Sequence, residues 1–96
     1  MMSKIPIKEN LGKMKKEVVD NEILRVGIIA ELDAINLYEQ LAAMTTDKNI
    51  KKMLLDIAKE EKTHVGEFQT LLLNRDKEQV EELEAGKKEV KEEVGE

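Results

Sequence analysis

Cysteine and tryptophan are absent from this sequence of 96 residues, and phenylalanine, tyrosine and proline occur once each. Without cysteine the chain can form neither disulfide bonds nor thiolate metal sites, and it has no thiol nucleophile. With aromatic residues at 2%, a core must be built from aliphatic side chains and methionine, a composition that favours helices over sheets. No stretch approaches the ~20 apolar residues of a membrane span, and residues 1–8 lack the apolar run of a signal peptide. We therefore expect a soluble intracellular protein with an all-α fold.

Basic residues are too few to suggest nucleic acid as a partner. The chain has 16 Lys and Arg against 21 Asp and Glu, a formal net charge of −5, whereas phosphate binding needs a basic face. An anionic surface instead attracts cations. A chain of this length forms one small domain with a small core, so a partner chain would add to its stability.

Hydrophobic periodicity separates a lead-in from two long helices. Residues 1–19 contain the only proline and lack a clear period, which predicts a flexible N-terminal lead-in. A first helix is expected from Asp20, a competent N-cap, to about Met44. After the capping residues 45–47, a second helix is expected over residues 50–73. The short connection makes the two helices antiparallel.

A short third helix is expected between Asp76 and Gly86. Asp76 and Gln79 have the spacing of a capping box, and Gly86 is a typical C-terminal glycine. Residues 87–96 are mostly charged, which predicts a solvated tail. Residues 20–86 should therefore form an antiparallel two-helix hairpin with a short third helix. Because two long helices cannot enclose a core alone, we expect two copies to dimerise into a four-helix bundle.

Two carboxylates, the only histidine and the only tyrosine fall in the apolar seams of the long helices. In the first helix, alternating intervals of three and four connect Leu24, Gly27, Glu31, Ala34, Tyr38 and Leu41. In the second helix, the same intervals connect Ile50, Leu54, Ile57, Glu61, His64, Phe68 and Leu71. A buried carboxylate without a partner costs several kcal/mol or takes up a proton, so such groups are normally paired or bound to metal.

The seam residues predict half of a dinuclear metal site. Glu61 and His64 lie about one turn apart on one helical face, which suits one metal ion, and Glu31 adds a carboxylate from the facing helix. Two chains related by a twofold axis would offer four Glu and two His, the ligand set of di-iron carboxylate bundles. Two divalent ions would cancel the charge of about −4 on the carboxylates. These ligands suit Fe(II) or Mn(II), and zinc would also bind.

The same residues also have structural interpretations. His64 could be a hydrogen-bonded core histidine. Tyr38, on the same face as Glu31, could hydrogen-bond a ligating carboxylate, reach the metal or serve as a core aromatic. Asp33, Glu60 and Glu67 fit a solvated helix face.

At these positions the sequence resembles a known family. The run IIAELDAINLYEQ at residues 28–40, with EEKTHVGEF at residues 60–68, resembles the encapsulated ferritins, the cargo of encapsulin nanocompartments. The resemblance covers residues 22–90 and is strongest to the form that is fused to the shell protein in some archaea. It implies a two-helix protomer, a ferroxidase site with two irons per dimer, and an annular decamer of five dimers. It further implies that Fe(II) is oxidised and mineralised within an encapsulin shell in the cytoplasm.

The functional residues implied by the resemblance follow by position. The family's metal ligands fall on Glu31, Glu61 and His64, with Glu61 bridging the two irons, and its site tyrosine falls on Tyr38. All four residue types are present.

Three features depart from the family pattern. Leu37 stands where some members carry tryptophan. Ala30 stands where some have an acidic residue, so only Asp33 remains of an outer pair through which metal would enter. Nothing after Gly86 resembles the shell-docking peptide of separately encoded members. We therefore expect a fragment or fused domain, or a protein that works without a shell.

Two function classes follow from the sequence. The first is a ferroxidase that holds two Fe(II) with Glu31, Glu61 and His64 from each of two chains. The second is a non-enzymatic helical assembly module, in which the polar seam residues only fix the register through buried hydrogen bonds.

Overall fold

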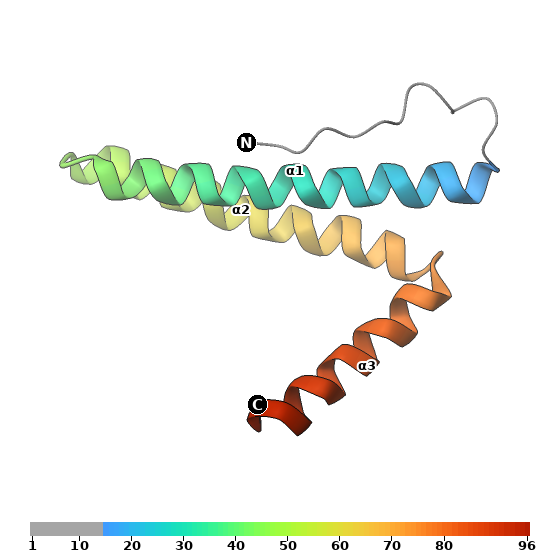
Figure 1. Cartoon of the computed structure of the whole chain (residues 1–96). Helices are drawn as coiled ribbons and strands as arrows, with labels where there is room; N and C mark the ends of the chain where they lie inside the picture. Colours follow the sequence, from blue (N-terminus) through green and yellow to red (C-terminus); the bar gives the residue numbers. More distant parts are fainter. Residues whose placement is uncertain (1–14) are drawn as a thin grey trace.

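Three α-helices form the fold in the computed structural model, which describes residues 15–96 (Figure 1). They are α1 (Lys16–Met44), α2 (Lys48–Leu73) and α3 (Lys77–Val94), and this part of the chain contains no strand. The all-α prediction is confirmed. No helix in the described range is both long and apolar enough to cross a membrane. Most of the predicted flexible lead-in, residues 1–14, lies outside the described residues.

The N-cap of the first helix lies five residues earlier than expected. Its N-cap is Lys15, which makes no side-chain capping hydrogen bond, and Asp20 lies inside the helix. The Lys15 carbonyl accepts hydrogen bonds from the backbone N–H groups of Val18 and Val19, both at 3.1 Å. The first turn therefore closes through the backbone alone, and Glu17 in that turn complements the positive end of the helix dipole. The prediction of Asp20 as the N-cap is wrong.

The turn between α1 and α2 matches the prediction. Asp47 is the N-cap of α2, and its Oδ1 accepts hydrogen bonds from the N–H groups of Asn49 (2.9 Å) and Ile50 (3.0 Å). Thr45 Oγ1 accepts from the Asp47 N–H at 3.1 Å. These bonds fix a three-residue connection, so α2 runs back antiparallel along α1 (Figure 1).

The buried core of the protomer is a narrow stripe between α1 and α2. It consists of Leu24, Ile35, Ala42, Ala58 and Leu72. Three of the predicted seam residues remain partly open, with Leu41 at 37%, Leu71 at 43% and Ile50 at 52% exposure. The hairpin therefore buries less of its apolar surface than the seam pattern offers.

The third helix is longer than predicted. Gly86 lies in its interior, and the helix continues to Val94, where Gly95 adopts a left-handed φ of 78° as the C-cap. An interior glycine costs only about 1 kcal/mol relative to alanine, which is too little to stop a helix that has other support. That support includes ion pairs one turn apart, Lys77–Glu81 and Lys88–Glu92, each at 4.0 Å. The prediction of Gly86 as the helix end is therefore wrong. Residues 87–96 are all exposed, as predicted for a solvated segment, but residues 87–94 are helical.

Asp76 joins α3 to the hairpin. Its Oδ1 accepts a hydrogen bond from the Gln79 N–H at 3.0 Å, which confirms its predicted capping role. Its Oδ2 lies 3.4 Å from Arg25 Nη1 on α1. From this junction α3 turns back beneath the hairpin and diverges from it toward its C-terminus, and it contains no buried residue (Figure 1).

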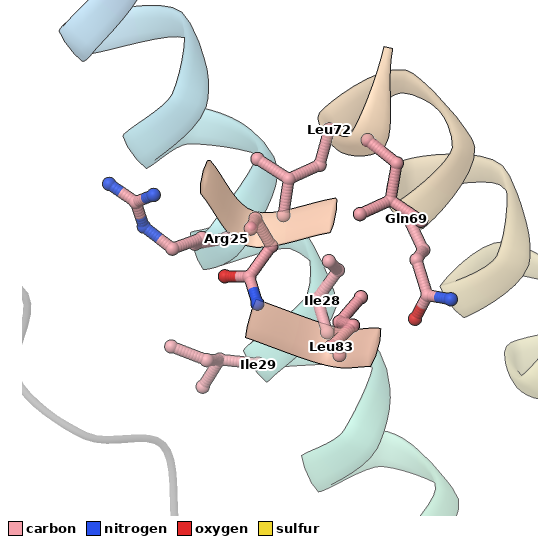
Figure 2. Close-up of a pocket in the computed structure, with 8 residues that line it drawn as sticks. Arg25, Ile28, Ile29, Gln69, Leu72 and Leu83 are labelled. Carbon is pink, nitrogen blue, oxygen red and sulfur yellow. The ribbon is translucent and has the colours of Figure 1, made fainter. Parts of the chain in front are cut away.

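An apolar groove of about 270 Å³ lies where the three helices meet. It is lined by Arg25, Ile28, Ile29, Gln69, Leu72, Leu73, Gln79 and Leu83. Figure 2 shows isoleucines of α1 and Leu83 of α3 in this groove.

Candidate metal centre

Glu31, Glu61 and His64 come together between α1 and α2. His64 Nδ1 lies 3.2 Å from Glu31 Oε2 and 3.5 Å from Glu61 Oε2. One ligand atom from each of the three side chains lies within 4.8 Å of the other two. Within residues 15–96 this is the one group of three or more carboxylate or histidine residues with such spacing. The structure therefore places close together the three residues that the sequence pattern indicated as ligands.

The donor spacing fits a divalent cation. Carboxylate oxygens and imidazole nitrogens bind such ions at about 2.0–2.2 Å, so two donors on one ion lie no more than about 4.4 Å apart. Both His64–carboxylate separations fall within this limit. The mixture of oxygen and nitrogen donors, without sulfur, suits iron, manganese or zinc.

The cluster lies at an open edge of the hairpin. The side chains of Glu31 and Glu61 are 18% and 19% exposed, and that of His64 is 42% exposed. A sealed structural histidine would be buried and fully hydrogen-bonded. The cluster is therefore accessible from solvent.

Proton binding at the cluster follows from the crowding of its charges. A hydrogen bond with Glu61 and partial burial raise the pKa of Glu31 above its ordinary value of 4.5. Partial burial lowers the pKa of His64, but the hydrogen bonds and charges of Glu31 and Glu61 together raise it above 6.5. Protons therefore compete with a cation for the Glu31 and His64 ligand atoms.

Tyr38 and Asp33 are not part of the cluster. Tyr38 is half-buried two turns beyond Glu31, and it takes part in none of the side-chain hydrogen bonds of the described chain. Asp33 lies about 200° around α1 from Glu31, because each residue advances the helix by about 100°. Glu60 and Glu67 are exposed, as expected for a solvated face. The roles implied for Tyr38 and Asp33 stay predictions.

One contact beside the cluster was missed in the sequence. Gly27, one turn before Glu31, lies against the ring of Phe68, one turn after His64. The available signal was a glycine in a seam otherwise made of larger side chains. On another part of the hairpin, Lys62 Nζ and Glu39 Oε2 form an ion pair at 3.1 Å, which also links the two helices.

Two carboxylates and an imidazole that converge between antiparallel helices are the type of ligand set found in the metal sites of helical bundles. Residues 6–86 match the model of the EncFtn-like family, and the chain therefore belongs to that family. Membership supports a ferritin-like, iron-related function.

Two relatives from Pyrococcus furiosus support this assignment. The chain is 66% identical over 74 residues to a ferritin-like–encapsulin shell fusion protein, in an alignment that covers 77% of this chain and 21% of the relative. The chain thus spans about a fifth of the length of that curated relative. It also matches the crystal structure of an encapsulated ferritin domain with a TM-score of 0.85 and 55% identity, over 100% of this chain and 98% of the other. The ferritin-like fold that the resemblance implied is confirmed.

Proposed function

We propose that this protein is a ferroxidase, which oxidises Fe(II) to Fe(III) at a di-iron site shared by two copies of the chain. The observation that carries the proposal is the convergence of Glu31, Glu61 and His64 at the open edge of the hairpin. Family membership makes iron the preferred ion among those that this donor set fits.

The need for a second copy follows from counting donors and from the exposed surface beside them. Three side chains leave an ion incompletely coordinated, and a twofold-related copy would supply the other three. Ile50, Ile57, His64 and Leu71 recur at intervals of seven, so they lie on one stripe of α2. Ile50 and Leu71 on this stripe are 52% and 43% exposed. A partner that covers the stripe would bury these side chains and close the site at once.

The proposed chemistry uses iron as the substrate. Each Fe(II) gives up one electron, so two ions supply the two electrons that reduce oxygen to hydrogen peroxide with uptake of two protons; peroxide is the other candidate oxidant. Glu61 of each copy would bridge the two ions. Glu31 and His64 would each bind a single iron ion. Tyr38 would hydrogen-bond a ligating carboxylate. Asp33 would lie outside the oxidation site, on the route by which the metal enters.

The destination of the ferric product is proposed from the relatives. The Pyrococcus furiosus relative joins a ferritin-like part to an encapsulin shell. We expect the present chain to act likewise, with an encapsulin shell in the cytoplasm around the mineral and five dimers arranged in a ring. The three helices of the described chain enclose no cavity large enough for mineral, so we propose that an enclosing partner stores it.

The assembly-module alternative is not favoured. The family to which the chain belongs supports an iron-related function, which a purely structural role would not explain. The three ligand candidates also bring two carboxylates to one histidine, a donor set that suits a metal ion.

An anaerobic Fe(II) titration of the wild-type protein, followed by admission of oxygen, tests the proposal. We expect saturation near one iron per chain, then formation of ferric absorbance well above the rate of a protein-free control. The absence of saturable binding, with oxidation equal to the control, would refute the ferroxidase function.

The shared site has its own test. Because ligands from two chains couple metal binding to association, anaerobic Fe(II) should raise the dimeric fraction at low protein concentration. Native mass spectrometry in chelator and in Fe(II) measures this fraction. A site that saturates in a protein that stays monomeric would contradict sharing between chains.

A further inference from the structure

Gly27 and Phe68 form a layer of the hairpin directly beside the metal cluster. Gly27 precedes Glu31 by four residues on α1, and Phe68 follows His64 by four on α2. Because the helices are antiparallel, both residues lie one turn from the cluster in the same direction. A contact one turn from the cluster can influence how far apart the two helices lie at the cluster.

The two residues approach as closely as a glycine permits. A Cβ atom placed on Gly27 would lie 3.0 Å from Phe68 Cε1 and 3.1 Å from both Cδ1 and Cδ2. Near-equal distances to opposite edges of the ring mean that Phe68 presents its face to the Gly27 backbone. An aromatic ring cannot shorten or fold away, so any side chain at position 27 must push α1 and α2 apart or turn the ring out of the seam.

We propose that Gly27 and Phe68 act as a spacer that sets the separation of α1 and α2 at the metal cluster. They are positioning residues, because they act through Glu31 and His64 rather than on the metal. The 3.2 Å distance between His64 Nδ1 and Glu31 Oε2 depends on this separation. Metal–ligand bonds tolerate deviations of about 0.2 Å, so a displacement of a few tenths of an ångström changes affinity. The inference rests on the proposed function, since it assumes that the cluster binds metal.

Gly27→Ala is the direct test, and Gly66→Ala is its matched control. Both replace a helical glycine by a better helix former, so neither should reduce helicity through propensity. A Cβ at Gly66 would meet nothing within 4 Å. Phe68→Leu, alone and combined with Gly27→Ala, completes a double-mutant cycle, because leucine lacks the rigid ring. The measurements are anaerobic Fe(II) affinity, far-ultraviolet circular dichroism and the imidazole NMR signals of His64, the only histidine.

We expect Gly27→Ala to weaken Fe(II) binding by about 10- to 100-fold while helicity is retained, a loss typical of residues that orient metal ligands. Gly66→Ala should bind like the wild type. The double variant should bind more tightly than Gly27→Ala, since the leucine relieves the contact. In the metal-free protein, the His64 imidazole signals should shift in Gly27→Ala and not in Gly66→Ala.

Two results would overturn the spacer. One is wild-type affinity in Gly27→Ala, and the other is a loss of affinity that Phe68→Leu does not reverse. If Gly27→Ala does not fold, the double variant decides: recovery of helicity together with affinity supports the spacer, and recovery of helicity alone refutes it. If the wild type itself shows no saturable binding, the proposed function fails, and the His64 signals of the metal-free variants still test the spacer separately.

Discussion

The α1–α2 hairpin and α3 are stable for different reasons. All five buried residues of the described chain lie in the hairpin, and α3 has none. The third helix depends instead on Asp76 at its start, Gly95 at its end and ion pairs between successive turns. Packing between helices thus sets geometry in the hairpin, whereas α3 is maintained by interactions local in sequence. The candidate metal centre lies in the region where packing can position side chains accurately.

The largest expected effect is the loss of metal binding on truncation of a ligand in the hairpin. Glu61→Ala removes one of the two carboxylates that contact His64, and in a twofold-related dimer it removes two ligands from one site. Saturable Fe(II) binding should disappear, and oxidation should fall to the protein-free rate. Glu60→Ala is the control, because Glu60 is exposed and adjacent. A Glu61→Ala variant with unchanged oxidation would remove Glu61 from the site.

The next comparison sets a core leucine of the hairpin against a leucine of α3. Leu72 is 4% exposed and Leu83 is 46% exposed. Leu72→Ala should lower the free energy of unfolding by about 2–5 kcal/mol, because it leaves a cavity. Leu83→Ala should lower it by less than about 1 kcal/mol. Urea unfolding of the metal-free protein at one fixed protein concentration measures both, and equal losses would contradict the division between the regions.

The junction between the regions should show an intermediate effect. Asp76→Ala removes the N-cap of α3 and the ion pair with Arg25 together, and should cost about 1 kcal/mol. Arg25→Ala removes the ion pair alone, which is partly exposed and should cost less than about 1 kcal/mol. Amide hydrogen exchange along α3 distinguishes the two, since only the loss of the cap should accelerate exchange in its first turn. Equal exchange in both variants would mean that the cap contributes nothing.

Gly86 in α3 should respond differently from Gly27 in the hairpin, whose Cβ position is crowded by Phe68. Gly86 is inside α3 and has open space around its Cβ position. Gly86→Ala should therefore stabilise α3 by about 0.5–1 kcal/mol through backbone entropy. Thermal unfolding followed by circular dichroism measures the gain. A loss of stability would indicate that another molecule approaches Gly86 closely.

The smallest expected effect is the dependence of the metal-free protein on pH. The pKa values of Glu31 and His64 are raised in the folded state, so the folded protein binds these protons more tightly than the unfolded chain. The stability that His64 contributes is fully present below 6.5 and is lost as the pH rises through its folded pKa. The midpoint of urea unfolding should thus fall slightly between about pH 6 and about pH 8, and less so in His64→Gln. Fe(II) affinity should rise over the same interval, because the metal displaces these protons. A midpoint that rises in the wild type relative to His64→Gln would contradict the raised pKa.

The sequence predicted the helices better than their ends. Seam periodicity placed α1 and α2, and the oxygen-bearing caps Asp47 and Asp76 were found because a capping side chain leaves a local signature. The start of α1 was missed because Lys15 caps through its carbonyl, which every residue possesses. The end of α3 was placed too early because an interior glycine costs only about 1 kcal/mol relative to alanine, which does not end a helix by itself, and the left-handed C-cap is Gly95 instead.

The candidate site could be predicted because its three ligand candidates occupy seam positions that antiparallel packing must bring together. Distances and exposure could not be predicted, since they depend on the angle and spacing of the helices. The contact between Gly27 and Phe68 likewise could not be predicted from the sequence. Periodicity marks both residues as seam members, but only three-dimensional packing shows that the ring lies against the bare backbone.

The three-residue turns at 45–47 and 74–76 have a consequence for the order of folding and assembly. Chains whose contacts are mostly local fold quickly, within microseconds to milliseconds for helical proteins, because little loop entropy opposes closure. Association of two copies is a bimolecular step whose rate falls with dilution. We expect each newly made chain to complete its hairpin long before it meets a second copy. Protein concentration in the cell, rather than the rate of folding, would then control how fast complete sites appear.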